Sequence, residues 1–98
     1  MEKGGSVYIM MNQRNTTLYV GVTSSLAVRI TKHKNKEYIN SFTKKYNIDK
    51  LVYFEDYDSI EDAIVREKMI KGWKKFKKIE LIKKENPGFK DLYEDILK

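Results

Sequence analysis

The sequence of 98 residues contains no cysteine, a single proline and a single histidine. Without cysteine, neither a disulfide framework nor a thiolate metal cluster is possible, and we expect a reducing cytoplasm as the location. No apolar run is long enough to span a membrane, and the N-terminal segment MEKGGSVYIMM is too short and too polar for a signal peptide. No repeat, low-complexity tract or linker divides the chain, so we expect one soluble domain over residues 1–98.

Basic residues outnumber acidic ones by 20 to 14 and gather in two blocks. Residues 66–84 carry nine basic and two acidic side chains, and residues 27–50 carry seven basic and two acidic ones. Residues 51–65, between these blocks, hold five acidic side chains and no basic one. This distribution is typical of a protein that binds a polyanion, or of a lysine-rich face that is simply solvated.

Two segments near the N-terminus, SVYIMM (residues 6–11) and TLYVGV (residues 17–22), alternate in the manner of β-strands. An even number of loop residues, such as NQRN or QRNT, places the aliphatic side chains of both strands on one face. Tyr8, Tyr19 and Gly21 then share the other face, where the two phenols lie close enough to line one site. Gly21 leaves room there for a ligand or another backbone. The competing interpretation is that tyrosine is merely a good strand former.

The rest of the chain predicts helices and a third strand. Ser24 or Ser25 is a candidate N-cap, and Ser59 with Asp62 forms a Ser-x-x-Asp start signal. We expect first a helix with Leu26, Arg29, Ile30 and His33 on one stripe, and then a strand at 51–55 that is buried on both faces. A helix from Ile60 to about Trp73 follows, and after it a lysine-rich helix that reaches NPG at 86–88. The last element is a docked helical segment with Phe89, Leu92, Tyr93, Ile96 and Leu97 on one side. Residues 35–49 give no clear prediction.

Glu67 stands where an apolar residue is expected. On a helical wheel it falls in the middle of the stripe formed by Ile60, Ala63, Ile64 and Ile70. A carboxylate taken out of water is costly unless it is paired, hydrogen-bonded or bound to a metal. The pattern leaves three partners open for it: Arg29, Lys71 at i+4, and a metal ion.

Arg29 and His33 are also turned inward on their predicted helix. A lone histidine on such a face is commonly a satisfied core residue, but this many polar groups is unusual for so small a core. Phosphodiester hydrolysis uses such a set, because it needs a base, cationic stabilisation of the phosphoryl oxygens and often a divalent metal. Arg29 suits a bidentate phosphate contact, Glu67 suits one hard cation such as Mg²⁺, and His33 or a tyrosine suits the general base.

These residues resemble a known family. VY at 7–8 and YVG at 19–21 resemble the two halves of the motif that names the GIY-YIG nuclease superfamily, although the first half lacks the leading glycine and isoleucine. GVTSSLAVRITKH resembles the family's helix with Arg29 and His33, and AIVREKMIKGWKK its helix with the metal-binding Glu67. FTKKYNIDKLVYFE and NPGFKDLYEDIL resemble small single-domain bacterial members.

The resemblance implies an α+β fold in which a small three-stranded antiparallel sheet is flanked by helices. It implies metal-dependent cleavage of DNA phosphodiesters, in repair or recombination, by a domain without a separate DNA-recognition domain. By carry-over, Tyr8 and Tyr19 border the active site, Arg29 stabilises the phosphoryl group, His33 assists, and Glu67 holds one Mg²⁺ or Mn²⁺. Asn86 corresponds to a late asparagine of some members.

Two other functions stay open at this stage. A nucleic-acid-binding module of the same fold would grip phosphate and stack a base without cutting. A protein-interaction adaptor would use the acidic segment 55–62. The residues that we expect to contact nucleic acid are Lys32, Lys44, Lys45, Lys71, Trp73, Lys74 and Lys75.

Overall fold

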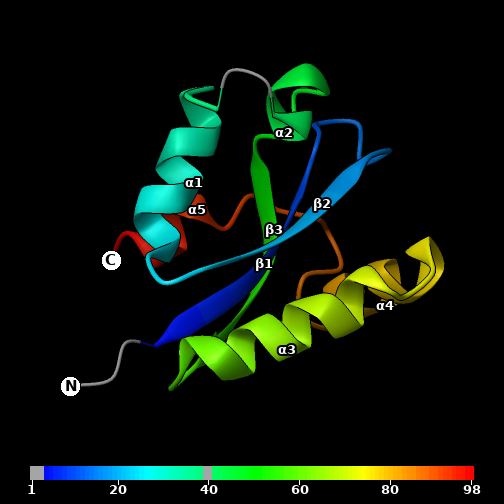
Figure 1. Ribbon diagram of the computed structural model, residues 1–98. Coiled ribbons are helices and arrows are strands. Elements are labelled where there is room, and N and C mark those ends of the chain that lie inside the picture. The colour runs from blue at the N-terminus through cyan, green and yellow to red at the C-terminus, as the bar shows by residue number, and fades with distance from the viewer. Residues whose placement is uncertain (1–3, 39–40) are drawn as a thin grey trace.

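The computed structural model describes residues 4–38 and 41–98, and its α+β fold confirms the expected class (Figure 1). The strands β1 (Gly5–Met11), β2 (Leu18–Thr23) and β3 (Lys50–Tyr57) form an antiparallel sheet in the order β2-β1-β3. The helices are α1 (Leu26–Lys34), α2 (Phe42–Lys45), α3 (Ile60–Lys71), α4 (Lys75–Glu85) and α5 (Tyr93–Ile96). Figure 1 shows α1 and α2 on one side of the strands and α3 and α4 on the other.

Residues 1–3 and 39–40 are not among the described residues. Residues 39–40 belong to the segment 35–49, for which no structure was predicted. In the rest of that segment the structure adds the one-turn helix α2. No helix within residues 4–38 and 41–98 is both long and apolar enough to cross a membrane.

The β1–β2 hairpin has the predicted facing of side chains. Tyr8 lies opposite Gly21, and Met10 lies opposite Tyr19, so both tyrosines share one face of the sheet. The loop contains six residues, 12–17, an even number as expected but longer than the four proposed. The reason is the Asn12 side chain, whose Oδ1 accepts the backbone N–H groups of Thr16 and Thr17 and closes the loop before the ladder continues.

Each face of the sheet has its own hydrophobic core. The core under α3 and α4 contains the aliphatic side chains of the hairpin, such as Val7 and Ile9, together with Ala63 and Ile70. The core under α1 and α5 contains Tyr8 and Met10 with Ile30 and other buried residues. Because β1 is the central strand, all of its residues are buried, and its alternation separates the aliphatic core from the tyrosine face.

The third strand is longer than the predicted 51–55 and is buried on both faces only in its first half. Ile9 of β1 lies opposite Tyr53, but the next residue, Met10, lies opposite Leu51. Val52 is therefore the extra residue of a β-bulge. Because of the bulge, the consecutive residues Val52 and Tyr53 both belong to the core under α3 and α4, whereas Leu51 belongs to the core under α1 and α5.

The helix starts and ends agree with the predictions at α3 more closely than at α1. Ser59 caps α3 by accepting the backbone N–H of Asp62, and the helix ends at Lys71, two residues earlier than expected. Ser25 precedes α1 but makes no side-chain cap; instead its own N–H donates to Thr23 Oγ1. Ile64, predicted on the buried stripe of α3, is 36% exposed because it lies at the edge of that stripe.

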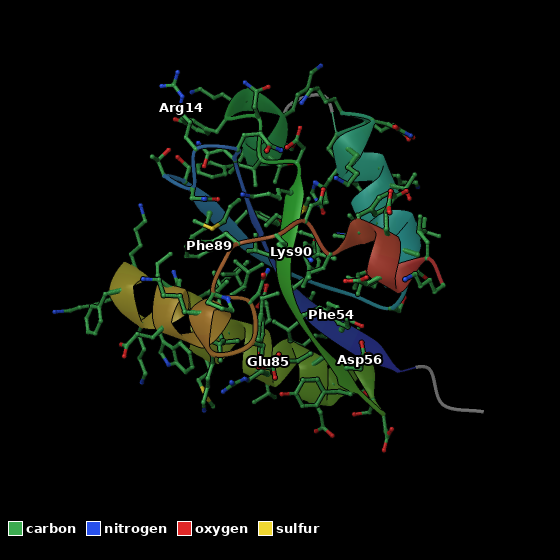
Figure 2. The ribbon with its side chains drawn as sticks, turned by 180° about the vertical axis from the view of Figure 1, so that it is seen from behind. Arg14, Phe54, Asp56, Glu85, Phe89 and Lys90 are labelled. Carbon is green, nitrogen blue, oxygen red and sulfur yellow. The ribbon has the colours of Figure 1, made fainter. Side chains whose placement is uncertain are left out.

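The C-terminal segment differs from the predicted helical segment. Only Tyr93–Ile96 forms a helical turn, Leu97 is exposed, and Phe89 has φ 52° and packs against the opposite core from Leu92 and Tyr93. Figure 2 shows this connection, with Phe89 and Lys90 labelled, passing from α4 across β3 towards α5. Asn86 holds its start: the amide donates to the carbonyl oxygens of Val52 and Lys90 and accepts the Lys90 N–H.

A polar network that the sequence did not predict joins β3 to α3. Glu55 accepts two hydrogen bonds of 3.0 Å from the Arg66 guanidinium and one each from the hydroxyls of Tyr53 and Tyr57. Burial opposes the charged carboxylate, but the hydrogen bonds from Arg66 and both tyrosines outweigh it and lower the pKa of Glu55. Glu55 therefore belongs to the framework of the fold.

We expect Glu55→Gln to lower the free energy of unfolding by about 2 kcal/mol, because the amide cannot accept the two Arg66 donors as a charge-assisted pair. A group with a lowered folded-state pKa stabilises the fold above its unfolded pKa and loses that effect as the pH falls. The free energy of unfolding, measured with urea, should therefore fall more steeply on acidification for the wild type than for the variant. Asp58→Asn, at an exposed position, is the matched control, and equal losses in both variants would contradict the prediction.

Candidate active site

The site is built around the Tyr8 side chain, which lies across Gly21 of the neighbouring strand. A methyl group at Gly21 would come 2.5 Å from the Tyr8 hydroxyl oxygen. The space above Gly21 is thus filled by a phenol of this chain, where we had expected a ligand or another backbone. Tyr8 is fully buried, and burial, followed by the nearby Tyr19 phenol, raises its pKa well above the usual value for tyrosine.

His33 of α1 lies over the tyrosine face and contacts both phenols. Its Nε2 is 3.2 Å from the Tyr8 hydroxyl, and its ring centroid is 5.8 Å from that of Tyr19. Burial, followed by the positive charge of Arg29, lowers the pKa of His33 to about 4. The imidazole is therefore neutral at neutral pH.

The second ring nitrogen of His33 is held by a residue that the sequence did not predict. Nδ1 lies 2.9 Å from Thr43 Oγ1, and Thr43 Oγ1 lies 3.0 Å from Ser41 Oγ. Ser41 is also the N-cap of α2, where its hydroxyl accepts the Lys44 N–H. Tyr8, His33, Thr43 and Ser41 thus form one continuous series of hydrogen-bonding side chains from the sheet to α2.

A cavity of about 310 Å³ opens beside this series. Its lining residues are Tyr19, Arg29, His33, Tyr38, Ser41, Phe42 and Thr43. Three of them are aromatic rings from different segments, and the ring planes of Tyr19 and Phe42 are 28° apart at a centroid separation of 6.5 Å. Tyr8 does not line the cavity. The structure therefore separates the two tyrosines: Tyr19 faces the open space and Tyr8 lies beneath it.

Arg29 provides the positive charge of this cavity. Its guanidinium carbon is 5.7 Å from the centroid of the Tyr38 ring, and its positive charge acts on the pKa of both His33 and the buried Tyr8 phenol. Arginine has only donors to offer, so its N–H groups suit an anion that enters the cavity.

Glu67 approaches the same region from the opposite side of the sheet. It is 8% exposed and lies with Ala63 and Ile70 on the buried stripe of α3, as predicted. Its carboxylate pairs with Lys71 at 2.8 Å. Of the partners that the sequence left open, the described chain thus shows the lysine at i+4. Lys71 Nζ is in turn 6.0 Å from the centroid of the Tyr19 ring. Glu67 is therefore linked to the cavity around the β2 edge, through Lys71 and Tyr19.

The donor set around Glu67 fits only a weakly coordinated hard cation. In the described part of the chain no three side chains of the types His, Cys, Asp and Glu gather to hold a metal. A Mg²⁺ ion accepts such a site, because it keeps most of its water ligands and often binds proteins through one or two carboxylates. A structural zinc site, which needs four protein ligands, does not fit these residues.

The predicted nucleic-acid contacts lie at different distances from the cavity. Lys44 and Lys45 are exposed on α2, whose Phe42 and Thr43 line the cavity, and Lys71 lies near Tyr19. Lys75 donates to the carbonyl oxygen of Thr16 in the hairpin loop, 2.5 Å away. Lys32 on α1 and Lys74 before α4 are exposed to solvent.

Trp73 and Asn86 have contacts within the fold. The Arg66 guanidinium carbon and Lys77 Nζ lie 5.2 and 4.4 Å from the centroid of the Trp73 ring, so two cations already occupy the surface we had expected to stack a base. Asn86 is buried and bonds to Val52 and Lys90, neither of which lines the cavity. Its position suits a structural role in the connection after α4.

Sequence reasoning missed the cavity wall formed by Tyr38, Ser41, Phe42 and Thr43. Two of these positions fall in a four-residue helix, which is too short to show a helical period. One signal was present: Ser41 stands three residues before Lys44, the spacing at which a serine side chain caps a backbone N–H.

Comparison with known proteins identifies the family. The sequence profile of the GIY-YIG catalytic domain matches residues 4–80. The chain therefore belongs to the GIY-YIG family, and so to the nuclease superfamily that this domain defines, which confirms the resemblance in the sequence.

The relatives are small proteins of similar length. A UPF0213 protein of Syntrophus aciditrophicus (strain SB) is 36% identical over 83% of this chain and 91% of its own. A UPF0213 protein of Pediococcus pentosaceus is 31% identical over 90% of this chain and 92% of its own. The solution NMR structure of a UPF0213 protein from Bacillus halodurans has the same fold, with a TM-score of 0.57 and 24% identity over 90% of this chain and 92% of that one.

We expect Gly21→Ala to displace the Tyr8 phenol, because the added methyl group would overlap its hydroxyl. The overpacking should lower the free energy of unfolding by about 1–3 kcal/mol, measured by urea denaturation. Gly88→Ala is the matched control, since a methyl group there meets only Lys90 Cγ at 3.9 Å. Equal stability of the two variants would show that Tyr8 does not need the space above Gly21.

Proposed function

We propose that this protein is a metal-dependent endonuclease that hydrolyses phosphodiester bonds of DNA in the cytoplasm, in repair or recombination. The observation that carries the proposal is the cavity in which Tyr19, Arg29 and His33 meet, with Glu67 linked to it through Lys71 around the β2 edge. Branched, damaged and single-stranded DNA are the candidate substrates. The family supports the reaction class, and the cavity supplies the residues that the reaction needs.

In this mechanism Tyr19 contacts the attacking water, which it orients or, as the phenolate, deprotonates, and Tyr8 does not. Tyr19 lines the cavity, whereas Tyr8 is fully buried and stays protonated because burial raises its pKa. Lys71, 6.0 Å from the centroid of the Tyr19 ring, and Arg29, which lines the same cavity as Tyr19, supply positive charge near this phenol. His33 is neutral, and Tyr8 and Thr43 occupy its two nitrogens, so it acts by orienting neighbouring groups.

Arg29 binds the phosphate. A bidentate guanidinium contact orients the phosphoryl group and stabilises the charge that develops on its oxygens as the water attacks. The aromatic walls reduce the solvent around this contact, which strengthens it. The guanidinium is partly buried and lies over the Tyr38 ring, so little reorganisation is needed when the substrate binds.

Glu67 is the residue that would hold a divalent cation, Mg²⁺ or Mn²⁺. When bound, such an ion would polarise the phosphate and stabilise the leaving oxygen. Glu67 must exchange Lys71 for the ion, and Lys71, which is exposed, is free to swing towards a substrate phosphate. One carboxylate supports a single ion better than a two-metal site.

The exposed lysines of α2 extend the positive charge of the cavity along the substrate. Lys44 and Lys45 lie next to the cavity wall on α2, and Lys71 lies near Tyr19, which also lines the cavity. Lysine contacts to phosphates give affinity without sequence readout. Trp73 is a weaker candidate for base stacking, because Arg66 and Lys77 already contact its ring.

The alternative is a nucleic-acid-binding module of the same fold without catalysis. The ion pair of Glu67 with Lys71 favours it, because that pair satisfies the buried carboxylate without a metal. The adaptor hypothesis has less support: Glu55, the first residue of the acidic segment, is used inside the fold, and Asp56 accepts a hydrogen bond from Ser6.

We expect Glu67→Gln to reduce cleavage of DNA at least about a hundredfold, because it removes the carboxylate that holds the cation. Cleavage is measured in Mg²⁺ and in Mn²⁺ on single-stranded, duplex, nicked and branched oligonucleotides. Binding of Mn²⁺, followed by electron paramagnetic resonance, should weaken in the same variant. Glu80→Gln, at an exposed position of α4, should leave both unchanged. Binding without cleavage by the wild type, unaffected by Glu67→Gln, would support the binding module instead.

We expect the double variant Lys44→Gln, Lys45→Gln to bind DNA more weakly with a smaller salt dependence. Each lost phosphate contact should reduce the slope of log affinity against log salt by about 0.7–0.9. Fluorescence anisotropy at several salt concentrations measures this slope. The control Lys83→Gln, Lys84→Gln removes the same charge from exposed positions of α4. An equal change of slope in both pairs would mean that α2 has no special part in binding.

A further inference from the structure

Hydrogen bonding beneath the cavity has a direction that the side-chain chemistry fixes. Tyr8 is fully buried, and within the described residues His33 Nε2 is the partner of its hydroxyl, at 3.2 Å. A buried phenol proton without an acceptor is costly, so the hydroxyl donates to Nε2.

The same reasoning extends to the other side of the imidazole. Nε2 carries no proton because it accepts a hydrogen bond from the Tyr8 hydroxyl, and the neutral ring therefore carries its proton on Nδ1. Nδ1 then donates to Thr43 Oγ1 over 2.9 Å, and the Thr43 hydroxyl donates to Ser41 Oγ over 3.0 Å. The donors run in one order, from Tyr8 through His33 and Thr43 to Ser41.

We propose that Thr43 is a positioning residue that holds His33 in the Nδ1–H tautomer and so keeps the imidazole bonded to the Tyr8 hydroxyl and beside the Tyr19 ring that faces the substrate. This role rests on the proposed nuclease function, but the hydrogen-bond arrangement does not. Thr43 is 3% exposed and does not itself touch the reacting atoms in the mechanism above. Removing its hydroxyl leaves Nδ1–H without an acceptor, and the ring can then relax to the other tautomer, in which Nε2–H donates to the Tyr8 oxygen.

The chain offers a direct readout, because His33 is its single histidine. In ¹⁵N-labelled protein, long-range ¹H–¹⁵N correlation spectra report which ring nitrogen carries the proton without any assignment ambiguity. We expect a protonated Nδ1 and an unprotonated Nε2 in the wild type and in Thr43→Ser, which keeps the hydroxyl. In Thr43→Val we expect the Nε2–H form, or a mixture of both tautomers.

A matched control is Thr31→Val on α1. Its hydroxyl bonds to Ala27 O and to the Tyr93 hydroxyl, so the same change of side chain is made away from the His33 ring. The control should keep the wild-type tautomer. An Nε2–H tautomer in the wild type, or an unchanged Nδ1–H signal in folded Thr43→Val, would overturn the proposal. If Thr43→Val fails to fold, the wild-type tautomer and the pair Thr43→Ser and Thr43→Ala decide in its place.

Kinetics test the second half of the proposal. Thr43→Val should reduce kcat on the best DNA substrate about tenfold, as expected for one misdirected buried hydrogen bond, while Thr43→Ser restores most of it. If the wild type cleaves no DNA, the proposed function fails while the tautomer measurement still decides the arrangement. If the wild type cleaves and Thr43→Val cleaves as fast, the nuclease stands and Thr43 loses its positioning role.

Discussion

The candidate site depends on the packing of the Tyr8 phenol across Gly21. Helices cover both faces of the central strand β1, so a tyrosine there must bury its ring and find a partner for its hydroxyl. Gly21 lets the ring lie flat against the neighbouring strand, and His33 supplies the partner. This placement fixes the position of α1 above the sheet. Arg29 follows, because it is one turn away from His33 on the same helix.

The site also shows how a small domain combines two cores. The aliphatic face of the hairpin packs against α3 and α4, and the tyrosine face packs against α1 and α5. Glu67 belongs to the first layer, and Tyr19 belongs to the second. They approach each other only because β2 is an edge strand, around which Lys71 reaches from α3 to the Tyr19 ring. The order β2-β1-β3 is therefore a requirement of the site as well as of the fold.

Much of this arrangement follows from short-range patterns in the sequence. The alternation of the hairpin predicted the shared face of Tyr8 and Tyr19, and the helical period predicted the inward positions of Arg29, His33 and Glu67. Thr43 and Phe42 escaped prediction because α2 is a single turn, with no period to read. The pair of Glu55 with Arg66 depends on how α3 docks on β3, which no local pattern contains. The end of the chain was mispredicted because Phe89 adopts a left-handed backbone conformation that interrupts the apparent period.

The neutral imidazole has a consequence for the electric field of the whole molecule. Histidine is the side chain whose ordinary pKa lies between pH 5 and 8, and cysteine, which can be shifted into that interval, is absent. With the pKa of His33 lowered to about 4, the protein has no histidine or cysteine charge that switches on within that range. Its net charge of +6 is then nearly constant from mildly acidic to mildly alkaline conditions. Long-range attraction of a polyanion is consequently governed by ionic strength and hardly by acidity.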